Sequence, residues 1–223
     1  MLKFKIPEVT IERFPIYLRS MNNLPDNFIL SSNKIAKVAG TTANQVRKDL
    51  SYLGRLGIRG KGYKIGKLKK EIIRILNIDR KWKIAIVGVG KLGSALLAYP
   101  GLKKGKFQIK LAFDNDPLKI GKTIEKITVQ NAEKIPELLP LHNVKIGIIT
   151  TPPEVAQDVA DKLIKGKVRG ILNFAPVQLT APKRIKVKNI DMSILLETIS
   201  YFITQEEFIL TGYTASVLSS GGK

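Results

Sequence analysis

The feature that most constrains this chain is a glycine-rich turn between an apolar run and a helical pattern. Residues 84–87 are apolar and mostly β-branched, which is typical of a buried strand. Gly88, Gly90 and Gly93 follow in the order Gly-x-Gly-x-x-Gly, and a helical pattern continues from Leu92. This strand–turn–helix order predicts an α/β fold with a Rossmann-type, doubly wound parallel sheet.

Each glycine of this turn has a separate physical reason. Gly88 allows the tight turn, Gly90 allows the backbone to approach a pyrophosphate, and Gly93 lets the helix pack closely on the strand. The N–H groups and the dipole at the start of the helix favour the negative charge of a phosphate. The sequence therefore predicts a dinucleotide site, with a purely structural βαβ turn as the alternative.

A second part of this signal lies downstream, where an alternating run over residues 107–113 ends at Asp114. Asp114 follows Gly93 by 21 residues (114 − 93), close to the spacing of a carboxylate that accepts from a ribose 2′-hydroxyl. An acid here favours NAD over NADP, because a 2′-phosphate would meet like charge. Asp116 is the alternative for the ribose contact.

Composition excludes several classes of protein. The 223 residues contain no cysteine and one histidine, His142, which excludes disulfides, thiolate catalysis and histidine-rich metal sites. No run of about 18 apolar residues occurs, and the first residues lack the apolar stretch of a signal peptide. We therefore expect a cytoplasmic protein that uses neither a metal nor a membrane.

The formal charge of +20 is concentrated in the first third of the chain. Through Lys83 there are 19 Lys and Arg against 6 Asp and Glu, a balance of +13, while the remaining 140 residues carry 19 against 12, a balance of +7. Such an excess attracts phosphate backbones or anionic membranes. A general lysine bias explains the +7 of the remaining residues better than the +13 of the N-terminal region. The excess in the N-terminal region therefore favours a nucleic-acid partner for it.

Two short helical patterns in this basic region predict a helix-turn-helix. Residues 31–40 indicate a helix with a serine cap and a glycine stop, and residues 41–53 indicate a second helix with a threonine cap. The second helix leaves polar side chains facing outward: Gln45, Arg47, Lys48 and Ser51. Gln and Arg suit base edges, whereas Lys and Ser suit phosphates. The alternative is an ordinary helical hairpin with a solvated basic face.

The next segment strengthens the interpretation as a DNA-binding domain. Residues 56–63 are glycine-punctuated and basic, which predicts a hairpin after the second helix, the wing of a winged helix. Arg59 and Lys61 at its tip suit a minor groove or a phosphate. Glycines in the hairpin permit close approach of the backbone to a duplex.

The remaining chain continues the alternation of strand and helix patterns. Residues 144–150 predict a buried strand that ends in Thr151 and Pro152, at the edge where ligands of open α/β sheets bind. Further strands are predicted over 170–174 and 185–191. The expected domains are a winged helix over 1–78, a Rossmann domain over 79–191, and a C-terminal helix with a tail over 192–223.

The C-terminal helix pattern is apolar around most of its circumference, over residues 194–203. A helix of this kind is usually buried. It can dock on its own domain or insert into a partner subunit, and the sequence leaves both arrangements open.

An NAD-dependent dehydrogenase is the main alternative function, and it needs a positioned acid or base. His142 lies in a loop before a strand, at the edge away from the expected site, and is interpreted as a surface histidine. Tyr63 and Lys67 match Tyr-x-x-x-Lys, but they precede the dinucleotide strand, so we treat the match as chance. A CoA-binding Rossmann module is a further alternative, and the basic N-terminal region argues against it.

Several stretches together resemble the Rex family of redox-sensing transcriptional repressors of bacteria. They are residues 45–52, 57–63, 88–93 with 99–101, 113–117 and 170–176. The resemblance implies a homodimer with an exchanged C-terminal helix, here about 192–208. It further implies inverted-repeat operator DNA that is bound when NADH is scarce and released when NADH binds. NAD⁺ competes for the same site.

The resemblance also assigns residues. It places the pyrophosphate on Gly88, Gly90 and Gly93 and the adenosine ribose on Asp114. The nicotinamide would lie near the segment after the strand at 170–174. The full expected cofactor set is Gly88, Val89, Gly90, Lys91, Leu92, Gly93, Tyr99, Asp114, Thr151, Pro152, Asn173, Phe174, Ala175 and Pro176.

Three further positions match those with which the family distinguishes ligand states, namely Arg19, Tyr99 and Asp191. The sequence departs from the family pattern at Leu53, where an aromatic residue is common, and at Pro15 in the first helix. Pro15 leaves two expectations for that helix, a kink or a late start.

Overall fold

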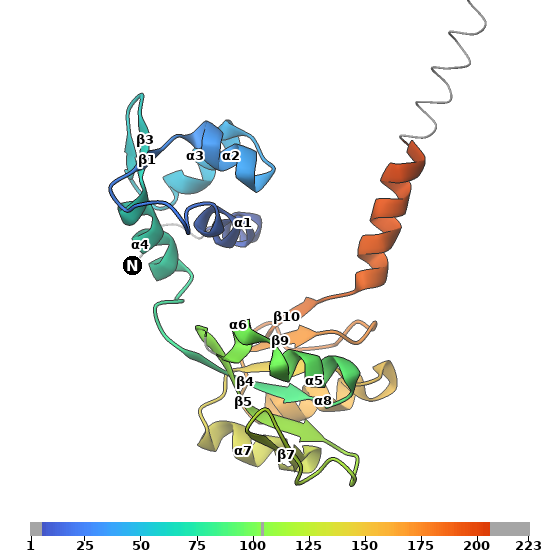
Figure 1. The fold of residues 1–223 in the computed structure, drawn as a ribbon. Coiled ribbons are helices and arrows are strands. Elements are labelled where there is room, and N and C mark those ends of the chain that lie inside the picture. Colours follow the sequence, from blue (N-terminus) through green and yellow to red (C-terminus); the bar gives the residue numbers. More distant parts are fainter. Residues whose placement is uncertain (1–5, 104, 206–223) are drawn as a thin grey trace, which may run out of the picture. The chain divides into compact units, whose positions relative to one another are not determined.

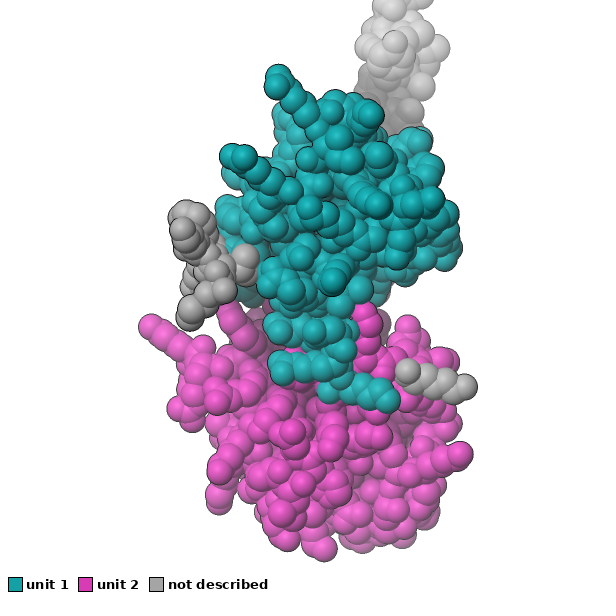
Figure 2. Space-filling view, turned by 90° about the vertical axis from the view of Figure 1, so that its left-hand side faces the viewer, with its two compact units in different colours: residues 1–81 teal, residues 82–223 magenta. Residues whose placement is uncertain are grey.

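The structure is a computed structural model that describes residues 6–103 and 105–205. The chain divides into two compact units, Met1–Lys81 and Trp82–Lys223, which are described separately (Figures 1 and 2). The fold class predicted from the sequence, an N-terminal winged helix followed by a Rossmann-type sheet, is confirmed.

The first unit combines helices with a small antiparallel sheet. Its described helices are α1 (Glu8–Arg19), α2 (Ser32–Ala39), α3 (Ala43–Ser51) and α4 (Ile65–Ile75). Its strands are β1 (Ile29–Leu30), β2 (Gly57–Ile58) and β3 (Gly62–Lys64), in the order β1-β3-β2. Phe14, Ile35, Leu50 and Ile72 are among the buried side chains that join the helices into one core. Helices α2 and α3 form the helix-turn-helix, and β2 and β3 form the wing.

The predicted caps of the helix-turn-helix are confirmed. Ser31 accepts a hydrogen bond from the N–H of Lys34 (3.3 Å), and Thr42 accepts one from the N–H of Gln45 (3.1 Å). Gly40 ends α2 in the left-handed region, with φ 62°. These short-range bonds satisfy N–H groups that the helices leave unpaired, so α2 and α3 begin where the sequence indicates.

Helix α1, the first helix of the chain, begins at Glu8 and ends at Arg19. Pro15 lies inside it, seven residues after its first residue Glu8 (15 − 8), so the proline does not delay the start of the helix. Phe14 and Tyr17 on the same helix are fully buried. Their burial stabilises a helix that lacks one backbone donor at the proline.

The second unit is built on a seven-stranded sheet in the order β10-β9-β8-β4-β5-β7-β6. All neighbouring pairs are parallel except β6 with β7. The strands are β4 (Trp82–Val87), β5 (Phe107–Asp114), β6 (Thr123–Ile124), β7 (Ile127–Asn131), β8 (Ile146–Ile149), β9 (Gly170–Asn173) and β10 (Lys186–Asn189).

Helices cover both faces of this sheet (Figure 1). One face packs against α5 (Lys91–Ala98) and α6 (Pro100–Lys103), the other against α7 (Ile135–Leu141) and α8 (Pro153–Lys165), with the short η1 (Ala132–Lys134) before α7. Strand β4 shows why the sequence reads as a continuous apolar run. Ile84 and Ile86 face α5, while Ala85 and Val87 face α8, so both sides are buried.

The predicted C-terminal helix is present over residues 192–205, and every residue in that range is exposed in this chain. Large apolar side chains such as Met192, Leu196 and Phe202 are 60–65% exposed. The expectation that this helix is buried is therefore not met within a single chain. Residues 206–208 of the expected helix, and the tail after them, lie outside the described residues.

Candidate cofactor cleft and DNA-binding surface

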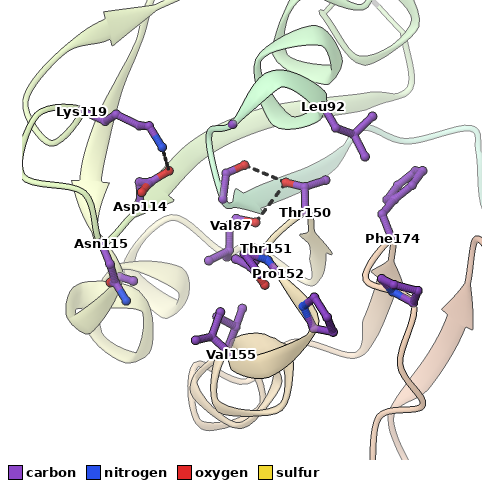
Figure 3. A pocket seen from close by; sticks show the side chains of 16 residues that line it. Val87, Leu92, Asp114, Asn115, Lys119, Thr150, Thr151, Pro152, Val155 and Phe174 are labelled. Atoms are coloured by element: carbon purple, nitrogen blue, oxygen red, sulfur yellow. Dashed lines mark hydrogen bonds and ion pairs between the residues drawn. The ribbon is translucent and has the colours of Figure 1, made fainter.

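A cleft of about 670 Å³ opens at the carboxyl ends of the central strands (Figure 3). Strand β4 lies between β8 and β5, so the strands that follow β4 in the chain are placed on both sides of it in the sheet. Open parallel sheets bind ligands at such a point. Residues that line the cleft are Val87, Gly88, Gly90, Leu92, Asp114, Asn115, Lys119, Ala132, Thr150, Thr151, Pro152, Pro153, Val155, Val159, Phe174 and Pro176.

The glycine turn is shaped by backbone contacts that exclude side chains. Gly88 has φ +93°, and a Cβ there would lie 2.8 Å from the carbonyl oxygen of Thr150. A Cβ on Gly93 would lie 2.0 Å from the carbonyl oxygen of Gly88. A Cβ on Gly90 would meet nothing within 4 Å, because this residue borders the open cleft. The tight turn and the close helix packing predicted for Gly88 and Gly93 are thus confirmed as structural roles.

Thr150 ties the end of β8 to this turn. Its hydroxyl donates to the carbonyl oxygen of Gly88 (2.7 Å) and also contacts that of Val87 (3.1 Å), as Figure 3 shows. The neighbouring Thr151 has a buried Oγ1 without a hydrogen-bond partner among the described residues. The sheet edge therefore presents a turn whose backbone is fixed before any ligand arrives.

Asp114 lies at the end of β5 and accepts hydrogen bonds from the turn itself. Its Oδ2 accepts from the N–H of Val89 (2.7 Å) and its Oδ1 from the N–H of Asp116 (2.9 Å). Lys119 places its Nζ 3.2 Å from Oδ2. Burial alone raises the pKa of Asp114, but the two N–H donors and the Lys119 cation outweigh it and lower that pKa. The cleft therefore holds an ionised carboxylate.

The rival acid is placed differently. Asp116 accepts from the N–H of Leu118 (2.9 Å), and its carboxylate is 3.6 Å from Lys119. Asp116 does not line the cleft, whereas Asp114 does. The structure therefore places only Asp114 of these two acids where a ligand in the cleft could contact it.

Eight of the expected cofactor residues line the cleft, namely Gly88, Gly90, Leu92, Asp114, Thr151, Pro152, Phe174 and Pro176. Val89 is buried and reaches Asp114 through its N–H, and Gly93 is buried beneath the turn. Lys91 is exposed at the start of α5. Tyr99 is 58% exposed beyond the end of α5 and outside the cleft lining.

Asn173 and Ala175 support the cleft from behind. The buried Asn173 amide donates to the carbonyl oxygens of Ala175 (3.0 Å) and Val177 (2.9 Å) and to the side chain of Asn189 (3.0 Å). Its Oδ1 accepts from the N–H of Ala175 (3.0 Å). This one side chain fixes the loop that carries Phe174 and Pro176 into the cleft.

Sequence reasoning missed several lining residues, above all Asn115 and Lys119 after β5 and Val155 and Val159 on α8. Their positions follow from the register of the elements. Asn115, Lys119 and Val155 lie one, five and six residues after the last residue of a central strand, which is the signal that would have found them. Val159 lies ten residues after Ile149, about one turn further along α8, and this signal does not reach it.

Arg19 and Asp191, the other two positions expected to distinguish ligand states, lie far apart in the chain. Arg19 is exposed at the last residue of α1. Asp191 accepts from the N–H of Ser193 (2.9 Å) at the start of the helix over 192–205.

A second hollow, of about 540 Å³, lies on the first unit between the start of α2, α3 and the wing. It brings together three of the expected DNA contacts, Arg47, Arg59 and Lys61. The Arg47 guanidinium donates to Ser32 at the start of α2 (2.9 Å) and to Asn44 on its own helix α3, so these two residues fix its orientation. A cationic groove beside a recognition helix and a wing suits a sugar–phosphate backbone.

The other expected DNA contacts lie on α3. Lys48 and Ser51 are exposed, and the Ser51 hydroxyl donates to the carbonyl oxygen of Lys48 (2.7 Å). Gln45 is only half-exposed, because its amide donates to the buried carboxylate of Asp49 (2.9 Å). In this structure the Gln45 amide is therefore engaged within the domain.

Asp49 is the centre of a buried polar cluster that the sequence did not reveal. Thr10 donates to it at 2.9 Å, Tyr17 at 2.6 Å, and Arg13 through two nitrogens at 2.6 and 2.8 Å. Burial opposes ionisation of Asp49, but these donors and Gln45 lower its pKa to about 2. The cluster fastens the recognition helix α3 to α1.

Comparison with known proteins covers both units. The family model described as "CoA binding domain" matches residues 79–177, and the one described as "Putative DNA-binding protein N-terminus" matches residues 5–51. The redox-sensing transcriptional repressor Rex of Carboxydothermus hydrogenoformans is 44% identical over 205 residues, covering 91% of this chain and 99% of that protein. Rex of Thermus thermophilus is 41% identical over 201 residues, covering 89% and 94%.

This chain belongs to the Rex family. Among solved structures, the Rex-family repressor RSP in complex with β-NAD⁺ and operator DNA has a TM-score of 0.85 at 30% identity, covering 99% of this chain and 100% of that one. RSP in complex with β-NADH has a TM-score of 0.82 at 30% identity, covering 94% and 99%. Because Rex relatives match both units, the CoA model marks a shared Rossmann module and does not favour the CoA-binding alternative.

Two further observations concern the described part of the chain. None of its helices is long and apolar enough to cross a bilayer. Within the same residues, no three His, Asp or Glu side chains are grouped so as to hold a metal ion.

Proposed function

We propose that this Rex-family chain is a DNA-binding transcriptional repressor that senses the balance of NADH and NAD⁺. It binds inverted-repeat operators as a homodimer when NADH is low, and NADH releases it. The observation that carries the proposal is the union in one chain of a basic winged helix with a Rossmann cleft containing an ionised Asp114. The relatives named Rex and the RSP complexes with NAD⁺, NADH and operator DNA support it.

The domain roles follow the predicted boundaries. Residues 1–78 bind DNA, residues 79–191 bind NAD(H), and residues 192–223 contain the helix that the two subunits exchange. The cofactor contacts are those lining the cleft around Asp114, together with Val89, Lys91, Gly93, Tyr99, Asn173 and Ala175. The DNA contacts are Gln45, Arg47, Lys48, Ser51, Arg59 and Lys61.

The switch requires that NADH bind two subunit arrangements with different affinity. In one arrangement the two recognition helices are about 34–36 Å apart, one turn of the DNA helix. NADH favours the other arrangement, in which this spacing is broken. Arg19, Tyr99 and Asp191 would change partners between the two states.

The proposal places the chain in the cytoplasm, associated with the nucleoid when it is bound to an operator, and assigns it no catalytic reaction. The relatives are named as repressors, which supports this reading indirectly. A dehydrogenase would instead show steady turnover, measured as absorbance at 340 nm with candidate 2-hydroxy acids.

The deciding experiment is fluorescence anisotropy of a labelled palindromic promoter fragment at fixed salt. Protein is titrated first, and NADH or NAD⁺ is then added separately. Release by NADH at concentrations where NAD⁺ has little effect is the expected result. Binding that ignores both nucleotides, or no binding to any palindromic fragment, would contradict the proposal.

A further inference from the structure

The cofactor cleft has two ends, and the glycine turn lies between them. In the sheet order β9-β8-β4-β5-β7, this turn follows the central strand β4. Phe174 and Pro176, after β9, line the cleft on one side of the turn, and Asp114 and Asn115, at the end of β5, line it on the other. Figure 3 shows Phe174 and Asn115 far apart across the cleft. A dinucleotide with its pyrophosphate on the turn therefore places one nucleoside at each end.

The end of the cleft at β5 has apolar walls. Ala132, directly after β7, and Val159 of α8 are buried, whereas Pro153 and Val155 at the start of α8 are exposed, and all four line the cleft. Walls of this kind accept the flat face of any nucleobase, so they add affinity without selecting the base. Selection among bases requires polar groups that meet the edge of the ring.

Three polar side chains at and after the end of β5 line the cleft, and two of them pair with each other. Asp114 accepts from the N–H groups of Val89 and Asp116 and from the Nζ of Lys119. The Lys119 ammonium lies 3.2 Å from the Asp114 carboxylate and 3.6 Å from that of Asp116. The hydrogen-bonding capacity of these two lining residues is therefore largely used within the chain.

Asn115 is the third polar side chain, and its amide is free within the described residues. The side chain is exposed and takes part in no hydrogen bond there. Its backbone is held in place, because the Asp114 carboxylate accepts from the N–H of Asp116 (2.9 Å) and so closes the turn around Asn115. The carbonyl oxygen and the NH₂ group of the amide therefore stand at the edge of the cleft with their hydrogen-bonding capacity unused.

The usual reasons for an asparagine in a turn do not apply to Asn115. Asparagine is common in turns because its side chain bonds the nearby backbone or because it tolerates a positive φ. Asn115 is not among the non-glycine residues with positive φ, and its side chain bonds no backbone group of the described residues. Turn geometry alone therefore gives the amide no role, while its place in the cleft lining points to a ligand.

The amide of Asn115 matches the edge of adenine. An asparagine amide presents an acceptor and a donor side by side. Adenine presents the complementary pair, an exocyclic amine that donates and a neighbouring ring nitrogen that accepts. Guanine carries a carbonyl oxygen in place of that amine, so an acceptor stands where adenine has a donor.

We propose that Asn115 selects the nucleobase of the cofactor. Its Oδ1 accepts from the exocyclic amine of adenine, and its Nδ2 donates to the ring nitrogen beside that amine. The inference rests on the proposed function, because it takes NAD(H) as the ligand of the cleft. NADH and NAD⁺ carry the same adenine, so Asn115 contributes equally to the binding of both.

The test is a double-mutant cycle between this side chain and the amine of the cofactor. NADH is compared with its etheno derivative, in which a two-carbon bridge closes the amine onto the ring and removes its N–H groups. The variant Asn115→Leu replaces the amide by an apolar group of similar size. The control Gln130→Leu makes the same kind of change on β7, outside the cleft lining, where the Gln130 amide only donates to the carbonyl oxygen of Thr128 (3.4 Å). Calorimetric titration of the full chain gives each affinity.

We expect Asn115→Leu to weaken NADH binding by about 5- to 10-fold, as for one or two neutral hydrogen bonds, and to weaken binding of the etheno derivative by less than about 2-fold. The preference for NADH over its etheno derivative should therefore fall in this variant and stay unchanged in Gln130→Leu. The ratio of NADH to NAD⁺ affinity should stay the same in all three proteins.

Three results would overturn the inference while leaving NAD(H) as the ligand. They are equal losses for NADH and the etheno derivative in Asn115→Leu, an unchanged NADH affinity in that variant, and an equal fall in preference in Gln130→Leu. Absence of NADH binding to the wild-type chain would overturn the proposed cofactor and this inference together, so the two failures are distinguishable.

Discussion

At the scale of single residues, we propose that Asp114 and Lys119, which both line the cleft, set its preference among nicotinamide cofactors. The carboxylate can accept from a ribose 2′-hydroxyl and repels a 2′-phosphate, while Lys119, 3.2 Å away, is the cation that would meet such a phosphate. We expect Asp114→Ala to weaken NADH binding by about 10- to 100-fold, the loss of one charge-assisted hydrogen bond. The affinity for NADPH should change little, so the preference for NADH over NADPH should fall.

Calorimetric titration with both cofactors measures this effect. Lys119→Ala is the matched control, because it keeps the acid and should keep the preference for NADH. If Asp114→Ala leaves the ratio of the two affinities unchanged, the ribose contact lies elsewhere.

Asp49 gives a second prediction at this scale. Its pKa is lowered to about 2 from a model-compound value of 3.8, so its ionised form stabilises the fold. That contribution, roughly 2 kcal/mol, is complete above pH 3.8 and is lost as the pH falls through 2. Asp49→Asn should lower the free energy of unfolding at pH 7 by at least that amount, with a difference that shrinks toward pH 2.

Urea unfolding of the two proteins at pH 7 and near pH 2.5 checks this expectation. Asp26→Asn is the control, because the Asp26 side chain is 77% exposed and should contribute less than about 0.5 kcal/mol. A loss for Asp49→Asn that is the same at both pH values would show that the carboxylate does not titrate as described.

At the scale of elements, the recognition helix and the wing should contribute differently to DNA binding. Arg47 on α3 is held by Ser32 and Asn44, so it is oriented before DNA arrives. We expect Arg47→Ala to lose discrimination between operator and scrambled DNA by about 1–3 kcal/mol. Lys61→Ala in the wing should weaken binding to the operator and the scrambled duplex equally, and should reduce the salt slope of the binding constant by about 1. Anisotropy over a salt series measures both, and the reverse pattern would exchange the two roles.

The elements also show how far the sequence could predict this protein. The caps at Ser31 and Thr42 and the turn at Gly88 depend on neighbours a few residues away, and these were predicted. The buried cluster on Asp49 joins residues 32 to 39 positions apart, for which no local pattern exists. The same holds for Val159 in the cleft, because it lies ten residues after the end of β8 (159 − 149) and reaches the cleft through the packing of α8.

At the scale of the whole molecule, the helix over residues 192–205 indicates an assembly larger than one chain. Its apolar side chains, including Leu195 at 61% and Phe202 at 60% exposure, would remain in water in a monomer. We expect Leu195→Glu/Phe202→Glu to shift a dimer toward monomer and to weaken operator binding at least tenfold, because two half-sites then bind independently.

Light scattering coupled to size-exclusion chromatography measures the assembly. Ser200→Glu, an exposed polar position on the same helix, is the control and should remain a dimer. If Leu195→Glu/Phe202→Glu and Ser200→Glu have the same mass in solution and the same operator affinity, the helix over residues 192–205 does not form the dimer interface.

The hydrogen bond from Val89 to Asp114 has a consequence for how the two redox forms can be told apart. It holds the glycine loop in a finished shape, so little ordering entropy is lost when a cofactor enters. NADH and NAD⁺ share the same adenosine diphosphate half, so a preorganised glycine loop binds this half of both cofactors equally well. The difference between them is the positive charge and planarity of the oxidised nicotinamide ring. On the proposed placement of that ring near Phe174 and Pro176, discrimination arises at that part of the cleft and not at the glycine loop.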